Sequence, residues 1–211
     1  MNRHFTGPED FAAHFNVSRE TMVRLEAYAA QLARWNPRIN LVSSASLTDL
    51  WHRHFADSAQ LFALRLPDAR LWLDLGAGAG FPGLVIAIMA HTAAPDLRLH
   101  LVESDQRKCV FLRSVATETG IALDISAERV ESLSPQSADI ISARALAPLP
   151  QLLAHAQNHL APGGIGLFPK GRTVHKELAE AARSWRFAHR VHPSLTDPEA
   201  AIVEIGAPTR V

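Results

Sequence analysis

The feature that most limits what this chain can fold into is a glycine-rich turn that follows a short apolar run. The run, Leu71–Leu75, has the length and composition of a buried strand, and four of the next eight residues are glycine. Glycine allows the backbone to turn sharply and to approach a ligand closely. A strand that passes through such a turn into a helix predicts a ligand site at the carboxyl ends of the strands of a parallel sheet.

Strands and helices alternate along most of the chain. Strand character is found in segments 71–75, 97–103, 121–127, 138–143, 165–168, 187–191 and 201–205. Helical character is found between them, in segments 82–90, 105–119, 148–160 and 173–184. This order predicts an α/β fold with a mainly parallel seven-stranded sheet that is covered by helices on both faces. Because no helix separates the last two strands, we expect them to form an antiparallel hairpin at one edge.

The first 66 residues are expected to be helical. One face of a first helix is formed by apolar residues at helical spacing, namely Met22, Leu25, Ala29, Leu32 and Trp35. This helix begins near Ser18, and we expect Pro37 to end it. A second helical stretch is expected over residues 46–66. The chain is therefore predicted to consist of an N-terminal helical extension, residues 1–66, and an α/β domain, residues 67–211.

Composition excludes several classes of protein. With 47% apolar and 20% charged residues the chain can bury a full core. Apolar runs fall well short of the roughly 20 residues that a membrane span needs, and the first residues lack the apolar stretch of a secretory signal. The single cysteine, Cys109, excludes an internal disulfide. We expect a cytoplasmic protein, a monomer, that binds neither membranes nor, despite its 11 histidines, a metal ion.

The charge balance predicts no general attraction to nucleic acid. Basic and acidic residues number 21 each, so the formal net charge at pH 7 is zero. Most basic residues are arginines, which suit phosphate and guanine contacts. A GC-rich genome explains the same bias more simply. Binding to RNA would then depend on a local patch, for which Arg34, Arg38 and Arg53 are candidates.

Two classes of ligand compete for the glycine-rich turn. Residues 78–83 match the G-x-G-x-x-G pattern of dinucleotide sites, with Glu103 where an acid for the ribose is expected. However, Pro82 lacks the N–H that would donate to a pyrophosphate, and Asp74 would repel phosphates. S-adenosylmethionine (SAM) has no phosphate but carries an ammonium and a sulfonium group. Asp74 favours both cations and Glu103 can accept from the ribose hydroxyls, so SAM is predicted over NAD.

An ordered set of short motifs extends from about residue 18 to residue 206. Its members are Trp35-Asn36, Ile39-Asn40-Leu41-Val42, Arg53-His54, Asp57-Ser58, the turn from Asp74 to Gly83, Glu103-Ser104, Lys108, Phe111-Leu112-Arg113, Arg129-Val130-Glu131, Ser142-Ala143-Arg144-Ala145 and Lys170-Gly171. In this order the motifs resemble those of the bacterial small-subunit ribosomal RNA guanine-N7 methyltransferases, the RsmG or GidB family. Two departures are Ala143, which separates Ser142 from Arg144, and Phe168-Pro169 before Lys170.

The resemblance implies both a fold and an activity. Residues 67–211 would form a Rossmann-like class I SAM-dependent methyltransferase domain. The reaction would be methylation of guanine N7 in 16S rRNA, at the position numbered 527, on the RNA or on the small subunit. The residues expected to contact SAM are Asp74, Gly76, Gly78, Phe81, Glu103, Val130, Glu131 and Arg144. Arg144 and Lys170 are the candidate catalytic residues, because either could hold O6 of the guanine.

The chemistry of N7 places few demands on the protein. N7 has a lone pair in the plane of the ring and carries no proton, so a general base is not required. We therefore expect catalysis by proximity and alignment. Because N7 and O6 face the narrow major groove of A-form RNA, the target guanine should be unpaired or in a distorted loop. A methyltransferase of a small molecule or a protein remains the first alternative, and an NAD-dependent oxidoreductase the second.

Overall fold

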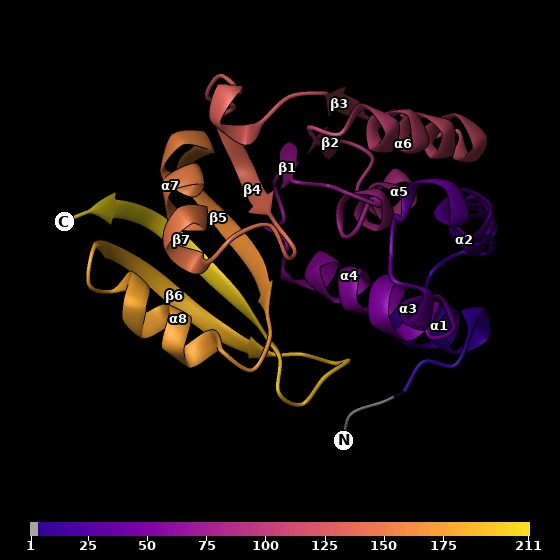
Figure 1. The fold of residues 1–211 in the computed structure, drawn as a ribbon, viewed down its shortest axis with the longest axis horizontal. Coiled ribbons are helices and arrows are strands. Elements are labelled where there is room, and N and C mark those ends of the chain that lie inside the picture. The colour runs from indigo at the N-terminus through magenta and orange to yellow at the C-terminus, as the bar shows by residue number, and fades with distance from the viewer. Residues whose placement is uncertain (1–3) are drawn as a thin grey trace.

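A seven-stranded sheet runs through the middle of the structure (Figure 1), a computed structural model that describes residues 4–211. The strands lie in the order β3-β2-β1-β4-β5-β7-β6. Their bounds are β1 Leu71–Leu75, β2 Arg98–Val102, β3 Asp124–Ser126, β4 Ala138–Ser142, β5 Leu160–Lys170, β6 Trp185–Pro193 and β7 Ala201–Arg210. The strands from β3 to β5 are parallel, whereas β7 runs antiparallel to both β5 and β6. The predicted sheet and its antiparallel edge hairpin are confirmed.

Helices cover both faces of the sheet (Figure 1). On one face lie α1 (Pro8–Phe15), α2 (Arg19–Ile39), α5 (Gly83–Ala93) and α6 (Gln106–Thr119), and on the other lie α7 (Leu149–His159) and α8 (Val174–Ala181). Side chains of β1 alternate between the two cores: Trp72 is buried with Leu84 of α5, whereas Leu73 is buried with Leu152 of α7. Among the described residues, no helix is long and apolar enough to cross a membrane.

The N-terminal helices share one core with the α/β part of the chain. Leu25 and Tyr28 of α2 are fully buried and belong to the same apolar cluster as Leu84 and Phe111. A hydrogen bond of 3.1 Å from Arg24 Nε to the carbonyl oxygen of Thr119 also connects α2 to the end of α6. The segment expected as an extension is therefore packed directly on α5 and α6.

Helix α2 begins and ends through local hydrogen bonds. The Ser18 side chain accepts from the amide of Thr21 at its start. The expectation that Pro37 ends the helix is wrong, because α2 continues to Ile39. The proline ring removes only one hydrogen bond this close to the end. The helix ends instead at Asn40, which has a φ of 47° and donates its amide to the carbonyl of Asn36 at 3.0 Å.

The helical stretch expected over residues 46–66 is confirmed as helical, but it is not one continuous α-helix. The segment consists of α3 (Ser44–Leu47), a π-helix (Trp51–Ala56), α4 (Asp57–Ala59) and a 3-10 helix (Gln60–Leu64). A π-helix is wider than an α-helix and is common at functional sites. Apolar spacing alone did not reveal this change of winding.

Strand lengths also differ from those expected. β3 is shorter than segment 121–127, and β5 spans Leu160–Lys170 rather than segment 165–168. β5 is paired on both sides, in parallel with β4 and antiparallel with β7. These neighbours supply hydrogen bonds to glycine and proline residues that have weak strand propensity on their own.

Candidate active site

The glycine-rich turn wraps over the carboxyl end of β1. Gly76, Gly78 and Gly80 have φ angles of 65°, 56° and 94°, in the left-handed region that side chains disfavour. A Cβ atom at Gly76 would also lie 2.6 Å from Cδ1 of Leu146. The positive φ therefore favours glycine at the point where the turn meets the loop that follows β4.

Asp74 lies beneath the turn and is fully buried. Its Oδ2 accepts from the amide of Gly83 at 3.0 Å, and its Oδ1 accepts from the hydroxyl of Ser142 at 2.6 Å. Trp72 Nε1 in turn donates to Ser142 Oγ at 2.8 Å. Burial raises the pKa of Asp74 to about 7, although the two hydrogen bonds and Arg144 act in the opposite direction. Asp74 thus ties β1 to β4 and to the start of α5 and does not line the cavity in front of the turn.

A cavity of about 510 Å³ opens in front of the turn. All the other predicted cofactor residues line it, namely Gly76, Gly78, Phe81, Glu103, Val130, Glu131 and Arg144. The wall also contains residues for which no cofactor role was predicted, among them Leu41, Val42, His54, Lys108, Leu146, Gln151 and His155. Three of these, Leu41, Val42 and His54, lie in the N-terminal segment. They belong to the short motifs that the chain shares with the family, and those motifs could have identified them. For Leu146, Gln151 and His155 the sequence offers no such signal.

Glu103 stands at the end of β2 with its carboxylate against the turn. It is 7% exposed; Oε2 accepts from the amide of Gly78 and Oε1 from the amide of Asp105, both at 2.8 Å. A carboxylate can accept about four hydrogen bonds, so two backbone donors leave capacity for two hydroxyl groups. This arrangement suits a ribose that is placed across the turn.

The arrangement of the turn fits SAM better than a dinucleotide. The wall of the cavity carries three carboxylates, of Glu103, Glu128 and Glu131, and three cationic side chains, of Lys108, Arg129 and Arg144, so its net charge favours neither ligand. The first amide of α5, that of Gly83, already donates to Asp74, so it does not point into the cavity as a phosphate donor.

A second cavity, of about 930 Å³, adjoins the first. The two share one stretch of wall, the loop after β4 that contains Arg144, Ala145, Leu146 and Ala147. Arg53 and Lys170 also line the larger cavity, whereas Arg34 and Arg38 lie exposed on α2 and line neither. A ligand in one cavity would therefore meet a ligand in the other at the loop after β4.

Residues of the N-terminal segment hold Arg144 in place at this junction. Arg144 Nη1 donates to Asp57 Oδ2 and to the carbonyl of Arg53, both at 3.2 Å, and Nη2 lies 2.9 Å from His54 Nδ1. Arginine has no acceptor, so His54 Nδ1 must accept. Burial, followed by the charges of Arg144 and Arg53, lowers the pKa of His54 to about 3 and keeps this ring neutral. Within residues 4–211, the other two N–H groups of the guanidinium have no partner.

Phe81 connects the turn to these residues. Its ring stacks on His54, with centroids 4.8 Å apart, and on Tyr28, with centroids 5.2 Å apart. The Arg144 guanidinium carbon lies 5.1 Å from the same ring centroid. Tyr28 also donates its hydroxyl to the carbonyl of Ala79 within the turn. The turn, α2 and the π-helix are therefore held together around one aromatic ring.

Lys170, the other candidate catalytic residue, supports the junction loop from the end of β5. Its Nζ donates to the carbonyl of Ala147 at 2.9 Å and to Glu177 Oε2 at 2.8 Å. Glu177 Oε2 also accepts from the amide of Leu149 at the start of α7. Burial raises the pKa of Glu177, but the contacts with Lys170 and Leu149 outweigh it and the pKa is lowered overall. Two of the three ammonium N–H groups thus donate to protein acceptors, which favours a positioning role for Lys170.

Comparison with known proteins identifies the family. The family model described as rRNA small subunit methyltransferase G, or GidB, matches residues 21–202. The chain belongs to the GidB family. Two relatives carry the name ribosomal RNA small subunit methyltransferase G. The one from Ruegeria pomeroyi is 53% identical over 196 residues, which are 93% of this chain and 96% of the relative. The one from Cereibacter sphaeroides is 49% identical over 199 residues, 94% of this chain and 97% of the relative.

Solved structures confirm the predicted class I SAM-dependent methyltransferase fold for this GidB-family chain. A TehB-like SAM-dependent methyltransferase from Corynebacterium glutamicum matches with a TM-score of 0.56 and 16% identity, over 88% of this chain and 100% of that chain. TYW2 of M. jannaschii, in complex with AdoMet, matches with a TM-score of 0.53 and 12% identity, over 72% and 74%. At these identities the similarity concerns the fold. Membership of the GidB family confirms the predicted enzyme class, an rRNA methyltransferase, and its methyl donor SAM.

Proposed function

We propose that this GidB-family enzyme methylates N7 of a guanine in 16S rRNA, with SAM in the smaller cavity and the target nucleotide in the larger one. The position numbered 527, which the family resemblance implies, is part of this proposal. The observation that supports it best is the wall that the two cavities share from Arg144 to Ala147. A methyl donor on one side of that wall and a base on the other would meet at the guanidinium of Arg144.

The smaller cavity offers a partner to each part of SAM. The carboxylate of Glu103 would accept from the ribose hydroxyls, since it keeps free acceptor capacity beside the turn. Val130 and Glu131 line the wall where the adenine would lie. Gly76 and Gly78 bring backbone close to the ligand, and Phe81 forms part of the wall near Arg144. Asp74 would act through the turn, by fixing its shape from below.

The reaction needs alignment more than proton transfer. When bound, SAM supplies a methyl group on a positively charged sulfur. The N7 lone pair attacks this carbon as the carbon–sulfur bond breaks, so the sulfur becomes a neutral thioether and the positive charge passes to the base. N7 loses no proton, and His54 and Asp57 are already engaged by Arg144 rather than poised as bases. Placing the two reactants in line can supply several kcal/mol of the barrier reduction.

Arg144 is the residue that would orient the base. Its two N–H groups without a partner among the described residues could donate to O6 and leave N7 free to react. Lys170 would act as a positioning residue, because its ammonium group holds the carbonyl of Ala147 and, through Glu177, the start of α7. An rRNA substrate supports a cytoplasmic location.

The proposal is tested with SAM labelled in its methyl group. The enzyme is incubated separately with 16S rRNA, with 30S subunits and with a protein and metabolite extract. We expect label in the RNA as 7-methylguanosine, located by mass spectrometry of digested nucleosides and by borohydride–aniline cleavage of the strand. Label on an exocyclic amine or a 2′-hydroxyl would contradict the N7 assignment. Label in the extract alone would favour a small-molecule or protein substrate. Arg98→Ala, an exposed change at the opposite end of β2, is the control expected to remain active.

A further inference from the structure

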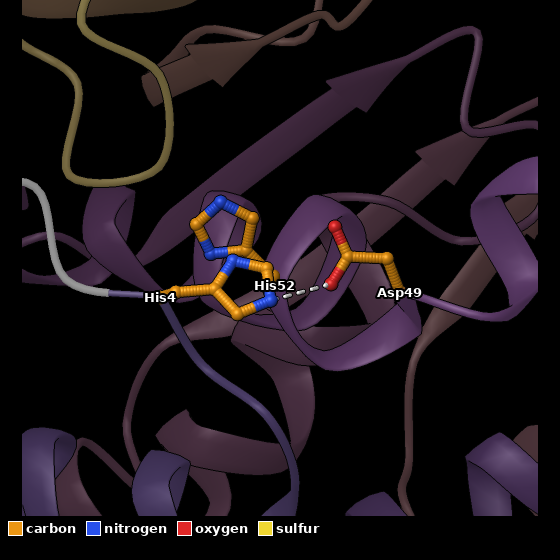
Figure 2. Close-up of side chains that lie close together, drawn as sticks. All are labelled: His4, Asp49 and His52. Atoms are coloured by element: carbon orange, nitrogen blue, oxygen red, sulfur yellow. Dashed lines mark ion pairs between the residues drawn. The ribbon is translucent and has the colours of Figure 1, made fainter.

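We propose that His4, Asp49 and His52 form a binding site for a divalent metal ion of the zinc type (Figure 2). One potential ligand atom from each residue lies within 4.8 Å of the other two. His4 precedes α1, Asp49 lies in the turn before the π-helix, and His52, three residues later, is the second residue of that helix. Figure 2 shows the two imidazole rings overlapping and the His4 ring directed at the carboxylate of Asp49.

The spacing of the ligand atoms fits a tetrahedral ion. His4 Nε2 lies 3.4 Å from Asp49 Oδ1, which is long for a hydrogen bond. Zinc–nitrogen and zinc–oxygen bonds of about 2.1 Å at a tetrahedral angle place neighbouring ligand atoms about 3.4 Å apart. Neighbouring ligands of an octahedral magnesium ion lie only about 3 Å apart. The ligand atom of the third residue, His52, lies within 4.8 Å of the other two, so a small side-chain movement would bring all three to this spacing.

The contacts of the two histidines are compatible with metal binding. His52 Nδ1 accepts from the amide of Phe5 at 3.4 Å, so this nitrogen carries a lone pair. The contact is longer than a normal hydrogen bond and could be exchanged for a metal. The His4 and His52 rings have centroids 4.4 Å apart, so a nitrogen of each ring is within reach of one shared ion.

The location of the cluster gives the ion a role. All three residues line the larger cavity, beside Arg53. Acidic side chains of Glu180 and Asp197 also line it and form no ion pair within the described part of the chain. A dication at this site would neutralise Asp49, and its fourth coordination position would open into the cavity, where a water or a phosphate oxygen can bind. It would also attach the segment before α1 to the turn that positions His54 and Asp57.

This proposal departs from the expectation, drawn from the sequence, that the protein binds no metal ion. Asp49 and His52 are spaced i, i+3, which places both on one face of a helical turn. An acid-x-x-His pair of this spacing is used in helical metal sites. His4 lies 45 residues before Asp49 in the sequence, so only the fold brings the third ligand into place.

The test measures metal binding by the whole protein, without RNA or SAM, so its outcome is independent of the proposed reaction. Metal-free protein is titrated with Zn²⁺ by calorimetry and with Co²⁺ by visible absorption. We expect one strong site per chain, with the intense visible bands of tetrahedral Co²⁺. His4→Ala and Asp49→Asn should each weaken binding at least about tenfold. Saturating Zn²⁺ should raise the Tm of the unmodified protein by about 5 °C, and the same Zn²⁺ concentration should raise that of His4→Ala by clearly less.

The controls distinguish this site from the other histidines. His4→Ala removes an exposed side chain before the first helix, so folding is not at risk. His189→Ala removes an exposed histidine on β6 and should bind as the unmodified protein does. Absence of a strong site, binding that His4→Ala and Asp49→Asn leave unchanged, or the weak bands of octahedral Co²⁺ would each overturn the proposal.

Discussion

The two cavities that meet at Arg144 have differently built walls. The smaller one contains the glycine-rich turn, whose backbone is held from below by Asp74 and from the side by Glu103, together with charged side chains such as Lys108 and Glu128. The larger one does not contain the turn and is lined by segments far apart in the sequence, including the start of the π-helix and the loop between β6 and β7. A small cofactor of fixed shape suits a turn whose backbone is held in place. An RNA segment suits a larger cavity to which many segments contribute side chains.

The largest effect is expected for a change of Asp74, the buried residue that holds the turn of the smaller cavity from below, and it concerns the free energy of unfolding. The folded pKa of Asp74, about 7, lies above the unfolded value of 3.8, so the folded state holds more protons and loses stability as pH rises through this range. Asp74→Asn keeps an acceptor for Gly83 and a partner for Ser142 but removes the charge. Urea unfolding should therefore show the Asp74→Asn variant gaining about 3 kcal/mol relative to the unmodified protein between pH 4.5 and pH 7.

The control for this comparison is Asp124→Asn, which changes an exposed carboxylate on β3. Its difference from the unmodified protein should stay nearly constant over the same pH range. If the difference in unfolding free energy between Asp74→Asn and the unmodified protein were also independent of pH, the pKa of Asp74 would not be raised in the folded protein.

Arg144→Ala should impair both cavities, because Arg144 belongs to both walls. The change removes the donor to Asp57 and His54 and the group proposed to orient the base, and we expect methyl transfer to fall at least about 100-fold. Arg144→Lys should recover little of this, since an ammonium group cannot reach three acceptors in the geometry of the guanidinium. Rates are measured by methyl incorporation into 30S subunits, with circular dichroism to verify folding. Near-normal transfer by Arg144→Lys would contradict the proposed role.

Glu103→Gln should affect the smaller cavity alone. The glutamine keeps one acceptor oxygen for the turn and loses the charge that would hold the ribose hydroxyls. SAM binding, measured by calorimetry, is expected to weaken about tenfold or more. Glu118→Gln, an exposed change on α6, provides the matched control. If Glu103→Gln bound SAM normally and lost only RNA methylation, the assignment of the two cavities would be reversed.

Arg53→Ala should have the smallest effect and act on the larger cavity alone. Its side chain lines that cavity, whereas its carbonyl, which accepts from Arg144, remains in the variant. We expect the KM for RNA to rise about fivefold and its salt dependence to decrease, with SAM affinity unchanged. The Arg34→Ala/Arg38→Ala double variant, which changes neither cavity, is the comparison. An equal rise in KM for both would extend the RNA contact onto α2.

Local sequence patterns predicted the sheet, the turn and the place of Glu103 beside it, because these depend on short-range features, whereas Val130, Glu131 and Arg144 were expected from the family resemblance. Strand length, glycine spacing and the acid at the end of β2 are all visible within about 30 residues. Asp74 was predicted to face the ligand, although alternation along β1 already places it on the same face as Trp72, toward α5. The partners of Arg144 could not be predicted, because His54 and Asp57 reach it only through a π-helix and a contact across about 90 residues of chain.

The common wall from Arg144 to Ala147 has a practical consequence for inhibitor design. Because the two cavities share this loop, one molecule with an adenosine-like end and a purine-like end could occupy both at once. The second end would then bind intramolecularly, at an effective concentration set by the linker. Such a compound would combine the contacts of a cofactor found in many enzymes with those of the larger cavity, so selectivity would come from the second half.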